Sequence, residues 1–266
     1  MLHDMIYAAQ RRLFPARARR WRIWKQHVPQ ATERIDHSAW DSLLARYARR
    51  DADATRVAYA SVTHADRAVL AQYIGALEST SVSKLNRPEQ FAFWANLYNA
   101  VTVRVILDNL PMASLRDIGV LPFWLGGGPW VSKRVSVEGW QLSLNDIEHR
   151  ILRRNWRDRR IHYALNCGAL GCPDLPLRAH AADNLEAVLD EAERAYVNDA
   201  RGAGFDGNRL VVSRIYGWYA ADFVAPGESI VEYLRRHARP DLAERLAGRR
   251  HVDGYRYDWA LNATEL

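Results

Sequence analysis

Both cysteines of the chain lie in one short segment, which runs from His162 to Pro173 and places Cys167 and Cys172 five residues apart. A histidine opens this segment, and two glycines separate the thiols. A cysteine reacts as its thiolate, so a catalytic cysteine needs a nearby base or amide donors that lower its pKa. Two cysteines cannot build the disulfide framework of a small secreted domain. The segment therefore predicts local chemistry.

The two thiols have unequal surroundings. Cys167 ends a β-prone run and is followed by a glycine-rich turn from Gly168, whose amides are suited to face a thiolate and an oxyanion. Cys172 precedes Pro173, which favours an extended backbone. We expect Cys167 to be the nucleophile, with Gly168 at the oxyanion position and Cys172 as a secondary candidate.

Three other interpretations of the segment stay open. Cys167 and Cys172 with His149 or His162 could bind zinc, although a Cys-x4-Cys spacing is slightly wide and no second cysteine pair exists. The two thiols could also form a redox pair, although their spacing is not Cys-x-x-Cys. Finally, both could be small apolar residues buried in a turn. The site is expected to need neither a metal ion nor a cofactor.

A second candidate group precedes the cysteines on a predicted helix from Ser143 to Arg153. Ser143 and Asp146 have the spacing of a capping box, and Glu148 then shares one helical face with apolar residues. A carboxylate among core positions must be paired or hydrogen-bonded. His149 lies at the edge of the same face and is the expected base. The alternative is that Glu148 is a structural anchor and His149 an ordinary half-exposed residue.

Two amides, Asn96 and Asn99, lie beside the apolar stripe of the predicted helix that Pro88 opens. They either orient other side chains or bind buried backbone groups. Adjacent helical positions diverge by about 100°, so Glu148 is poorly placed to bond the ring of His149. Asn99 is then the expected orienting residue, Glu148 lines the site, and His162 is the alternative base.

The composition indicates a folded protein with a basic N-terminal arm. The chain has 266 residues, 48% of them hydrophobic, and a net charge of +6. The arginines are spread along the chain, which argues against a specific nucleic-acid site. The segment from Arg11 to Lys25 either packs its aromatic residues on the domain or contacts an anionic membrane. No span or signal-peptide core is present, so a cytoplasmic location is expected.

The pattern of apolar residues predicts an α+β fold. It consists of a helical appendage over residues 1–55 and one mixed domain over 56–266, in which several helices pack a small, mostly antiparallel sheet. A loop is expected at Gly126–Pro129. The predicted helices cover 37–50, 63–77, 88–109, 143–153, 181–197, 215–223 and 229–238, with a hairpin over 131–144 and strands over 161–166 and 210–213. Several tryptophans are expected either in the core or along a hydrophobic or glycan-binding cleft: Trp94, Trp124, Trp130, Trp140 and Trp218.

Five blocks in order resemble the signature of domain-of-unknown-function family 547, over residues 56–262. The blocks are Phe91–Ala100, Leu144–Arg153, His162–Pro173, Ser213–Phe223 and Tyr257–Asn262. The resemblance implies that Glu148, His149 and Cys167 occupy blocks shared by bacterial and plant members, which favours Cys167 over Cys172 and His149 over His162. Such a set is similar to the sites of papain-like or transglutaminase-like enzymes with a permuted order.

The resulting hypothesis is a thiol-dependent hydrolase or acyltransferase that acts on an amide or ester of a small molecule or peptide. Cys167 attacks, His149 moves the proton, and Gly168 holds the oxyanion. A non-catalytic binding or scaffolding module is the competing class, and a zinc-structured domain is the third.

Overall fold

The computed structural model describes residues 21–51, 54–118 and 128–264. The longer helices and their bounds are α3 (Ser38–Tyr47), α4 (His64–Glu78), α5 (Arg87–Asp108), α8 (Leu185–Val197), α11 (Ile230–His237) and α12 (Pro240–Leu246). The short ones are α6 (Arg153–Trp156), α7 (Ile161–Ala164), α9 (Arg214–Trp218) and α10 (Ala220–Phe223), with a π-helix η6 (Asp146–Leu152). Single 3-10 turns are η1 (Trp21–Lys25), η2 (Tyr59–Ser61), η3 (Val82–Lys84), η4 (Leu115–Asp117) and η7 (Ala182–Asn184).

The strands form three small sheets, which confirms the predicted α+β class. Two are antiparallel pairs, β1 (Ala48–Arg50) with β2 (Thr55–Val57) and β3 (Val135–Val137) with β4 (Trp140–Leu142). In the third, β5 (Ala203–Asp206) pairs antiparallel with β6 (Arg209–Ser213), and β7 (Gly254–Arg256) pairs parallel with β6. The β3–β4 pair is the predicted hairpin: Glu138 and Gly139 join its strands at positive φ of 47° and 78°, as a tight two-residue turn requires.

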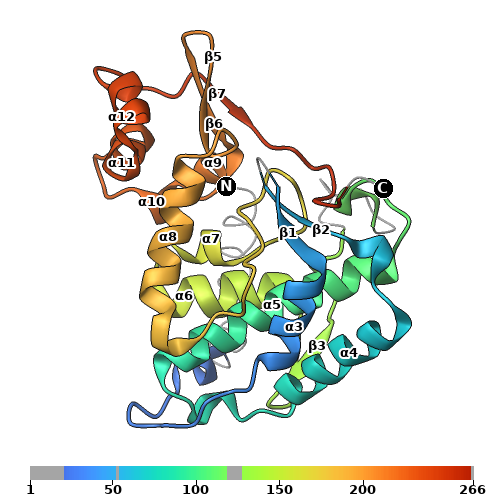
Figure 1. The fold of residues 1–266 in the computed structure, drawn as a ribbon. Coiled ribbons are helices and arrows are strands. Elements are labelled where there is room, and N and C mark those ends of the chain that lie inside the picture. The colour runs from blue at the N-terminus through green and yellow to red at the C-terminus, as the bar shows by residue number, and fades with distance from the viewer. Residues whose placement is uncertain (1–20, 52–53, 119–127, 265–266) are drawn as a thin grey trace.

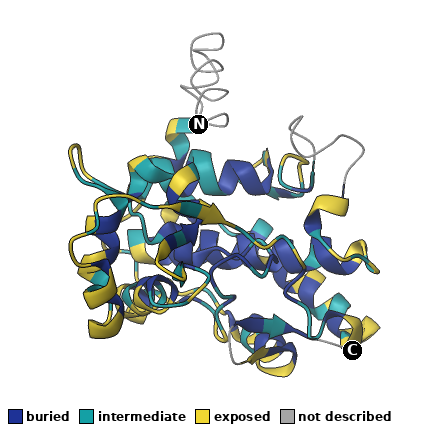
Figure 2. Cartoon of the chain, turned by 90° about the horizontal axis from the view of Figure 1, so that it is seen from above, coloured by how far each residue is buried: buried dark blue, intermediate teal, exposed yellow. Residues whose placement is uncertain are grey.

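Helix α5 is the centre of the fold (Figure 1). Asn86 caps it by accepting the amide of Glu89 at 3.0 Å, and Pro88 stands in its first turn, where a missing amide proton costs nothing. Almost every residue from Glu89 to Leu107 is buried, so α5 is enclosed on all sides (Figure 2). A polar side chain on this helix must therefore find its partners inside the protein.

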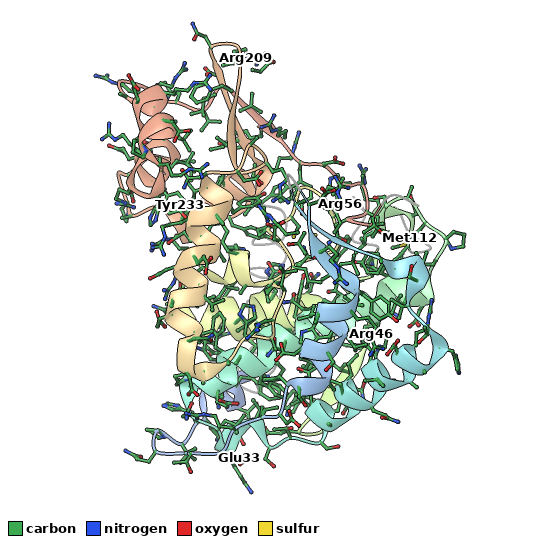
Figure 3. The ribbon with its side chains drawn as sticks, in the orientation of Figure 1. Glu33, Arg46, Arg56, Met112, Arg209 and Tyr233 are labelled. Atoms are coloured by element: carbon green, nitrogen blue, oxygen red, sulfur yellow. The ribbon has the colours of Figure 1, made fainter. Side chains whose placement is uncertain are left out.

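The core has two parts. The larger cluster surrounds α5 and includes Trp24, Trp40 and Val57. Trp24 and Trp40 precede the expected domain boundary at Arg56, so residues on both sides of that boundary share one core. The smaller cluster lies between α8, the β5–β7 sheet and α11. There Tyr233 of α11 donates to Glu193 of α8 at 2.8 Å, while Arg209 marks the outer end of the β5–β6 hairpin (Figure 3).

Beyond β7 the chain crosses the top of the molecule and ends beside β2 (Figure 1). Residues 257–262 of this crossing, which we call the strap, are fixed at the far end where Asn262 O accepts the amide of Val57 at 2.9 Å. The strap thus ties the smaller cluster to the larger one.

Three local predictions differ from the structure. Residues 161–166 do not form a strand, because Asp158 Oδ1 accepts the amide of Arg160 at 2.8 Å and starts the helical turn of α7. The predicted helix over 215–223 breaks into α9 and α10 at Tyr219, whose ring stacks on His162 at 4.3 Å. Most of the helix predicted over 143–153 is π-helical.

The described part of the N-terminal segment, η1, packs on the domain. Trp24 is buried, and its ring meets that of Trp94 edge to face at 5.1 Å. The arginines before Trp21, Trp124 and the glycines at 126–127 lie outside the described residues. Among the residues described, no helix combines the length and the apolar composition needed to cross a membrane.

Candidate active site

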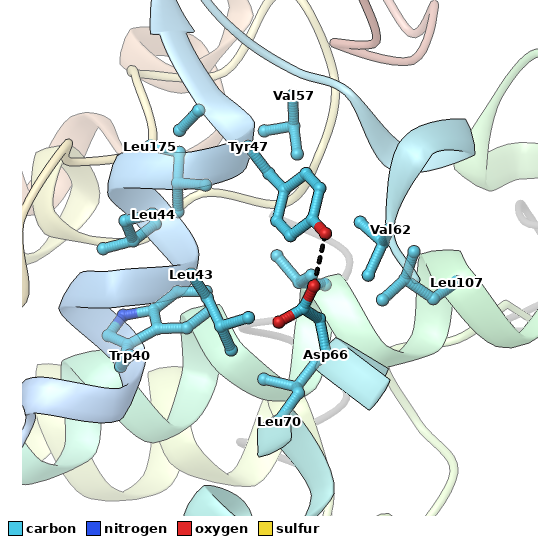
Figure 4. Close-up of a pocket in the computed structure, with 12 residues that line it drawn as sticks. Trp40, Leu43, Leu44, Tyr47, Val57, Val62, Asp66, Leu70, Leu107 and Leu175 are labelled. Carbon is cyan, nitrogen blue, oxygen red and sulfur yellow. Dashed lines mark hydrogen bonds between the residues drawn. The ribbon is translucent and has the colours of Figure 1, made fainter. Parts of the chain in front are cut away.

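A small cavity between α3 and α4 is not a site of chemistry (Figure 4). Its volume of about 20 Å³ is that of one water molecule. Its one carboxylate, Asp66, is bound by Tyr47 Oη at 2.5 Å and by Arg46 at 2.6 Å. The remaining lining is apolar, so this carboxylate anchors two helices.

The Cys167 loop is held from within by Asn166. The side chain of Asn166 accepts the amide of Gly168 at 2.8 Å and donates to Pro173 O at 2.7 Å. Gly168 has a φ of +82°, and a Cβ there would lie 2.6 Å from Ile106, so only glycine fits. The amide of Gly168, the expected oxyanion donor, is therefore occupied by Asn166 in this structure.

The strap pairs with this loop from outside. Leu170 N and Gly171 N each donate at 2.8 Å, to Ala260 O and Asp258 O, and Asn262 N donates to Gly168 O at 2.9 Å. A Cβ on Gly171 would lie 2.6 Å from the amide of Asp258, so glycine permits this approach. The amides of Gly168, Leu170 and Gly171 are thus used within the structure, which corrects the oxyanion role expected for Gly168. The amide of Ala169 does face the sulfur of Cys167.

One donor to the sulfur of Cys167 is the side chain of Tyr257. The half-buried thiol lies 3.1 Å from Tyr257 Oη. Burial raises the pKa of Tyr257, so the hydroxyl keeps its proton and donates to the sulfur. Sequence analysis did not select this residue, although it lies in one of the quoted blocks.

Several hydrogen bonds act on the same sulfur. The hydrogen bond with Cys172 lowers the pKa of Cys167, burial raises it, and bonds from Tyr257 and from the amide of Ala169 lower it, so that it lies below its ordinary value. Burial raises the pKa of Cys172, which keeps its proton and accepts the amide of Cys167 at 3.1 Å. The thiols are thus unequal: Cys167 is the more acidic.

Asn99 and Asn96 bind backbone. Asn99 Nδ2 donates to Ala164 O at 3.0 Å and its Oδ1 accepts the amide of Asn166 at 2.9 Å. Asn96 makes the same pair of bonds with His180, at 2.8 and 2.9 Å. Asn99 therefore fixes the chain that leads to Cys167 and does not orient a histidine, which corrects the role expected for it.

The π-helix η6 brings Glu148 close to His149. Its wider turn is visible in the bond from Arg153 N to Glu148 O, which spans five residues. Glu148 Oε1 lies 3.5 Å from His149 Nδ1, and Arg153 Nη1 lies 3.1 Å from the same nitrogen. The hydrogen bond of His149 Nδ1 is thus with Arg153, and Glu148 lies within ion-pair distance of the same nitrogen.

His162 of α7 completes a buried charged group, which we call the histidine cluster: Glu148, His149, Arg153, His162 and Asp222. His162 Nε2 lies 2.7 Å from Asp222 Oδ2, and its Nδ1 lies 3.9 Å from Glu148 Oε1. Arg153 Nε donates to Asp222 Oδ2 at 2.6 Å. Asp222 and Arg153 were not selected from the sequence, although both lie in quoted blocks.

The charges of the cluster compensate one another. Burial raises the pKa of Glu148. The charges of His149, His162 and Arg153 together lower it by more, so the pKa stays below its usual range. Burial likewise opposes ionisation of Asp222, yet bonds from His162 and Arg153 hold its pKa far below normal. Both carboxylates are therefore ionised near neutral pH.

The charges of the thiol and of the histidine cluster act on the same tyrosine. Tyr98 Oη donates to Glu148 Oε2 at 3.3 Å. Burial raises the pKa of Tyr98, and the charges of Glu148 and Cys167 raise it further. The charge of Glu148 also raises the pKa of Cys167. Among the described residues the Cys167 sulfur makes no hydrogen bond to an imidazole; its side-chain partners are Tyr257 and Cys172.

The described parts of the chain contain no cluster of metal-ligating side chains. There, His, Cys, Asp and Glu side chains form no group of three or more that could hold a metal ion.

Comparison with known proteins identifies one family. Residues 82–197 match the family model described as "Protein of unknown function, DUF547". This confirms the resemblance over those residues, which include Glu148, His149, Cys167 and Cys172 but not Asp222 or Tyr257. No curated protein and no solved structure matches the chain.

Proposed function

Since residues 82–197 belong to the DUF547 family, whose description assigns no reaction, we propose one from the site: a thiol-dependent hydrolase or acyltransferase acting on an amide or ester. The observation that supports it most is the half-buried thiol of Cys167, with the hydroxyl of Tyr257 3.1 Å from its sulfur and a pKa lowered by hydrogen bonds. A cysteine that only fills space has no need of such donors.

In the proposed reaction the sulfur of Cys167 forms a bond to the carbonyl carbon, and the carbonyl electrons move to the oxygen. The leaving group departs with the proton lost by the thiol, and a thioester remains. Water or an acceptor nucleophile then attacks the thioester and restores the thiol. Charge passes from sulfur to the carbonyl oxygen in the first step, and the hydroxyl of Tyr257 can follow it, because it is a side-chain donor that rotates.

We assign the proton transfer to His149, with Glu148 fixing its tautomer. A base at Nε2 needs its hydrogen on Nδ1, which a carboxylate favours by accepting it. Glu148 at 3.5 Å is that acceptor, whereas Arg153 at 3.1 Å favours the opposite tautomer. Catalysis therefore requires the Nδ1 hydrogen bond to pass from Arg153 to Glu148 when substrate binds.

His162 is less suited to this role because both of its nitrogens face carboxylates. Asp222 is 2.7 Å from Nε2, and Glu148 is 3.9 Å from Nδ1. We propose that His162 holds the charge balance of the cluster. We further propose a permuted papain-like or transglutaminase-like core, since His149 precedes Cys167, and a reducing, cytoplasmic location, since both cysteines are free.

Iodoacetamide labelling followed by peptide mass spectrometry tests the proposal. Selective alkylation of Cys167 near neutral pH is expected, with a large loss of rate in His149→Ala and no change in His251→Ala, which alters an exposed histidine. A panel of p-nitrophenyl esters should then give a burst of one product per chain that Cys167→Ala abolishes. No labelling, or equal labelling of both thiols, would contradict the enzyme and favour a non-catalytic binding module.

A further inference from the structure

Tyr257, the donor to the Cys167 thiol, is one of four half-buried aromatic residues whose rings form a continuous group. We call Trp130, Trp218, Tyr257 and Trp259 the aromatic platform. The ring of Tyr257 lies 5.0 Å from that of Trp218 and 4.6 Å from that of Trp259, and Trp130 lies 6.1 Å from Trp259. All four are only partly buried, in contrast to the core tryptophans Trp24, Trp40 and Trp94. Core packing alone therefore does not account for the platform.

The strap and α9 bring these rings together. Side chains alternate along an extended chain, so Tyr257 and Trp259 share one side of the strap, while the backbone at Asp258 and Ala260 pairs with the Cys167 loop. From α9, Gly217 lies so close to Tyr255 that a Cβ would meet its ring at 3.1 Å. This close approach of α9 and β7 places Trp218 against Tyr257.

We infer that the aromatic platform is the subsite for the acyl part of the substrate, and that this part carries an aromatic ring beside the scissile carbonyl. The inference rests on the proposed function. Tyr257 belongs both to the platform and to the thiol's hydrogen bonds, so a group bound on the platform is next to the attacking sulfur. The platform rings are tilted against each other by 41° to 65°, and this mixture of faces and edges suits another aromatic ring.

A sugar is a poorer occupant of the same surface. Its hydroxyls need several polar partners beside the stacking rings; the guanidinium of Arg116 lies over the ring of Trp259, but two other neighbouring polar groups are used within the protein. Ser114 Oγ donates to Trp259 O at 2.7 Å, and Asp258 Oδ1 accepts the amide of Ala260 at 2.9 Å. An aromatic ring needs no such partners.

Chloroacetamides with different N-substituents test the inference on the full chain. The probes are N-benzyl, N-hexyl and glucosamine chloroacetamides, with N-methyl chloroacetamide as the reference. Each rate of Cys167 alkylation is divided by the rate with free cysteine. We expect the benzyl probe to react about tenfold faster than the reference, as one or two aromatic contacts would give.

Variants distinguish the contribution of the aromatic platform to the benzyl preference from general changes in the reactivity of Cys167. Trp218→Ala and Trp259→Ala should each lower the benzyl preference, which is the ratio of the benzyl rate to the reference rate in the same variant, several-fold. Trp218→Phe should retain most of this ratio. Trp140→Ala removes another half-buried tryptophan, beside Trp21, and should change neither rate. Circular dichroism melts verify that each variant is folded.

The outcomes are distinct. Equal rates for all probes, a preference for hexyl or glucosamine, or a benzyl preference that survives both alanine variants would overturn the aromatic subsite and leave the nucleophile intact. A Cys167 that reacts with none of the probes, the reference included, would overturn the proposed function and this inference together.

Discussion

Replacing Tyr257 with phenylalanine removes one hydroxyl and should make Cys167 a slower nucleophile. The hydroxyl lies 3.1 Å from the sulfur and donates to it. A hydrogen bond to a charged acceptor contributes about 1.5–3 kcal/mol, and a neutral thiol receives much less from the same donor. The loss therefore falls mainly on the thiolate, and the pKa of Cys167 should rise.

The size of the effect follows from that difference. A loss of about 1.4–2.8 kcal/mol lowers the thiolate fraction at fixed pH by about tenfold to a hundredfold. A more basic thiolate is also a better nucleophile, and on a logarithmic scale this gain in reactivity offsets a little under half of the fall in thiolate fraction. The alkylation rate near neutral pH should thus fall by about 3- to 10-fold. The bonds from Cys172 and Ala169 remain, so the reaction is not abolished.

The assay is the pH dependence of Cys167 alkylation by iodoacetamide, read by peptide mass spectrometry from pH 5 to 10. The midpoint should move upward in Tyr257→Phe. Tyr255→Phe is the matched control, because it removes the hydroxyl of an exposed tyrosine on β7, two residues before Tyr257, and should leave the profile unchanged. A midpoint that stays in place, or moves downward, in a folded Tyr257→Phe variant would refute the role of this hydroxyl.

Three further substitutions test the surroundings of the site by urea unfolding. Asn99→Ala leaves a buried carbonyl and a buried amide unpaired and should cost about 3 kcal/mol in the free energy of unfolding. Asn109→Ala removes one bond to Val105 O at an exposed position and should cost about 1 kcal/mol or less. Equal costs would show that the loop does not depend on Asn99. Glu148→Gln should cost about 3 kcal/mol at pH 7. The pKa of Glu148 is lower in the folded state than in the unfolded state. Its charge therefore stabilises the fold above its unfolded pKa, and this stabilisation is lost as the pH falls through its folded pKa. The difference in unfolding free energy between wild type and Glu148→Gln should shrink below about pH 4. Burial lowers the pKa of His180 to about 4, so between about pH 6.5 and 4 only the unfolded chain takes up its proton and stability falls. His180→Gln should flatten this loss, and an unchanged slope would assign it to other groups.

Elements with local signals could be predicted from the sequence. Thr63 caps α4 by accepting the amide of Asp66 at 3.1 Å, and the Glu138–Gly139 turn joins the predicted hairpin. These signals involve residues only a few positions apart, so no knowledge of the rest of the chain was needed. The buried face of α5 followed in the same way from its apolar spacing.

The site itself depends on contacts that no local pattern encodes. Nothing in the sequence of η6 distinguishes a π-helix from an α-helix. The backbone partners of Asn99, Ala164 and Asn166, are more than 60 residues away along the chain, so its role could not be predicted either. The sequence favours Cys167 over Cys172 through the turn after Cys167, the proline after Cys172 and the family blocks. The hydroxyl of Tyr257 that bonds its sulfur comes from another part of the chain and was not predicted. Pairings across such separations are set by the packing of the whole domain.

The position of the strap late in the chain determines when Cys167 meets its hydrogen-bond donor during synthesis. Tyr257 is 90 residues later in the chain than its sulfur partner. At a rate of about 5–20 residues per second, a ribosome needs roughly 5 to 20 seconds to add those residues. In that interval the nascent chain holds the thiol without the hydroxyl that acidifies it and without the strap that closes its loop. The thiol thus gains its full acidity only after the strap has docked.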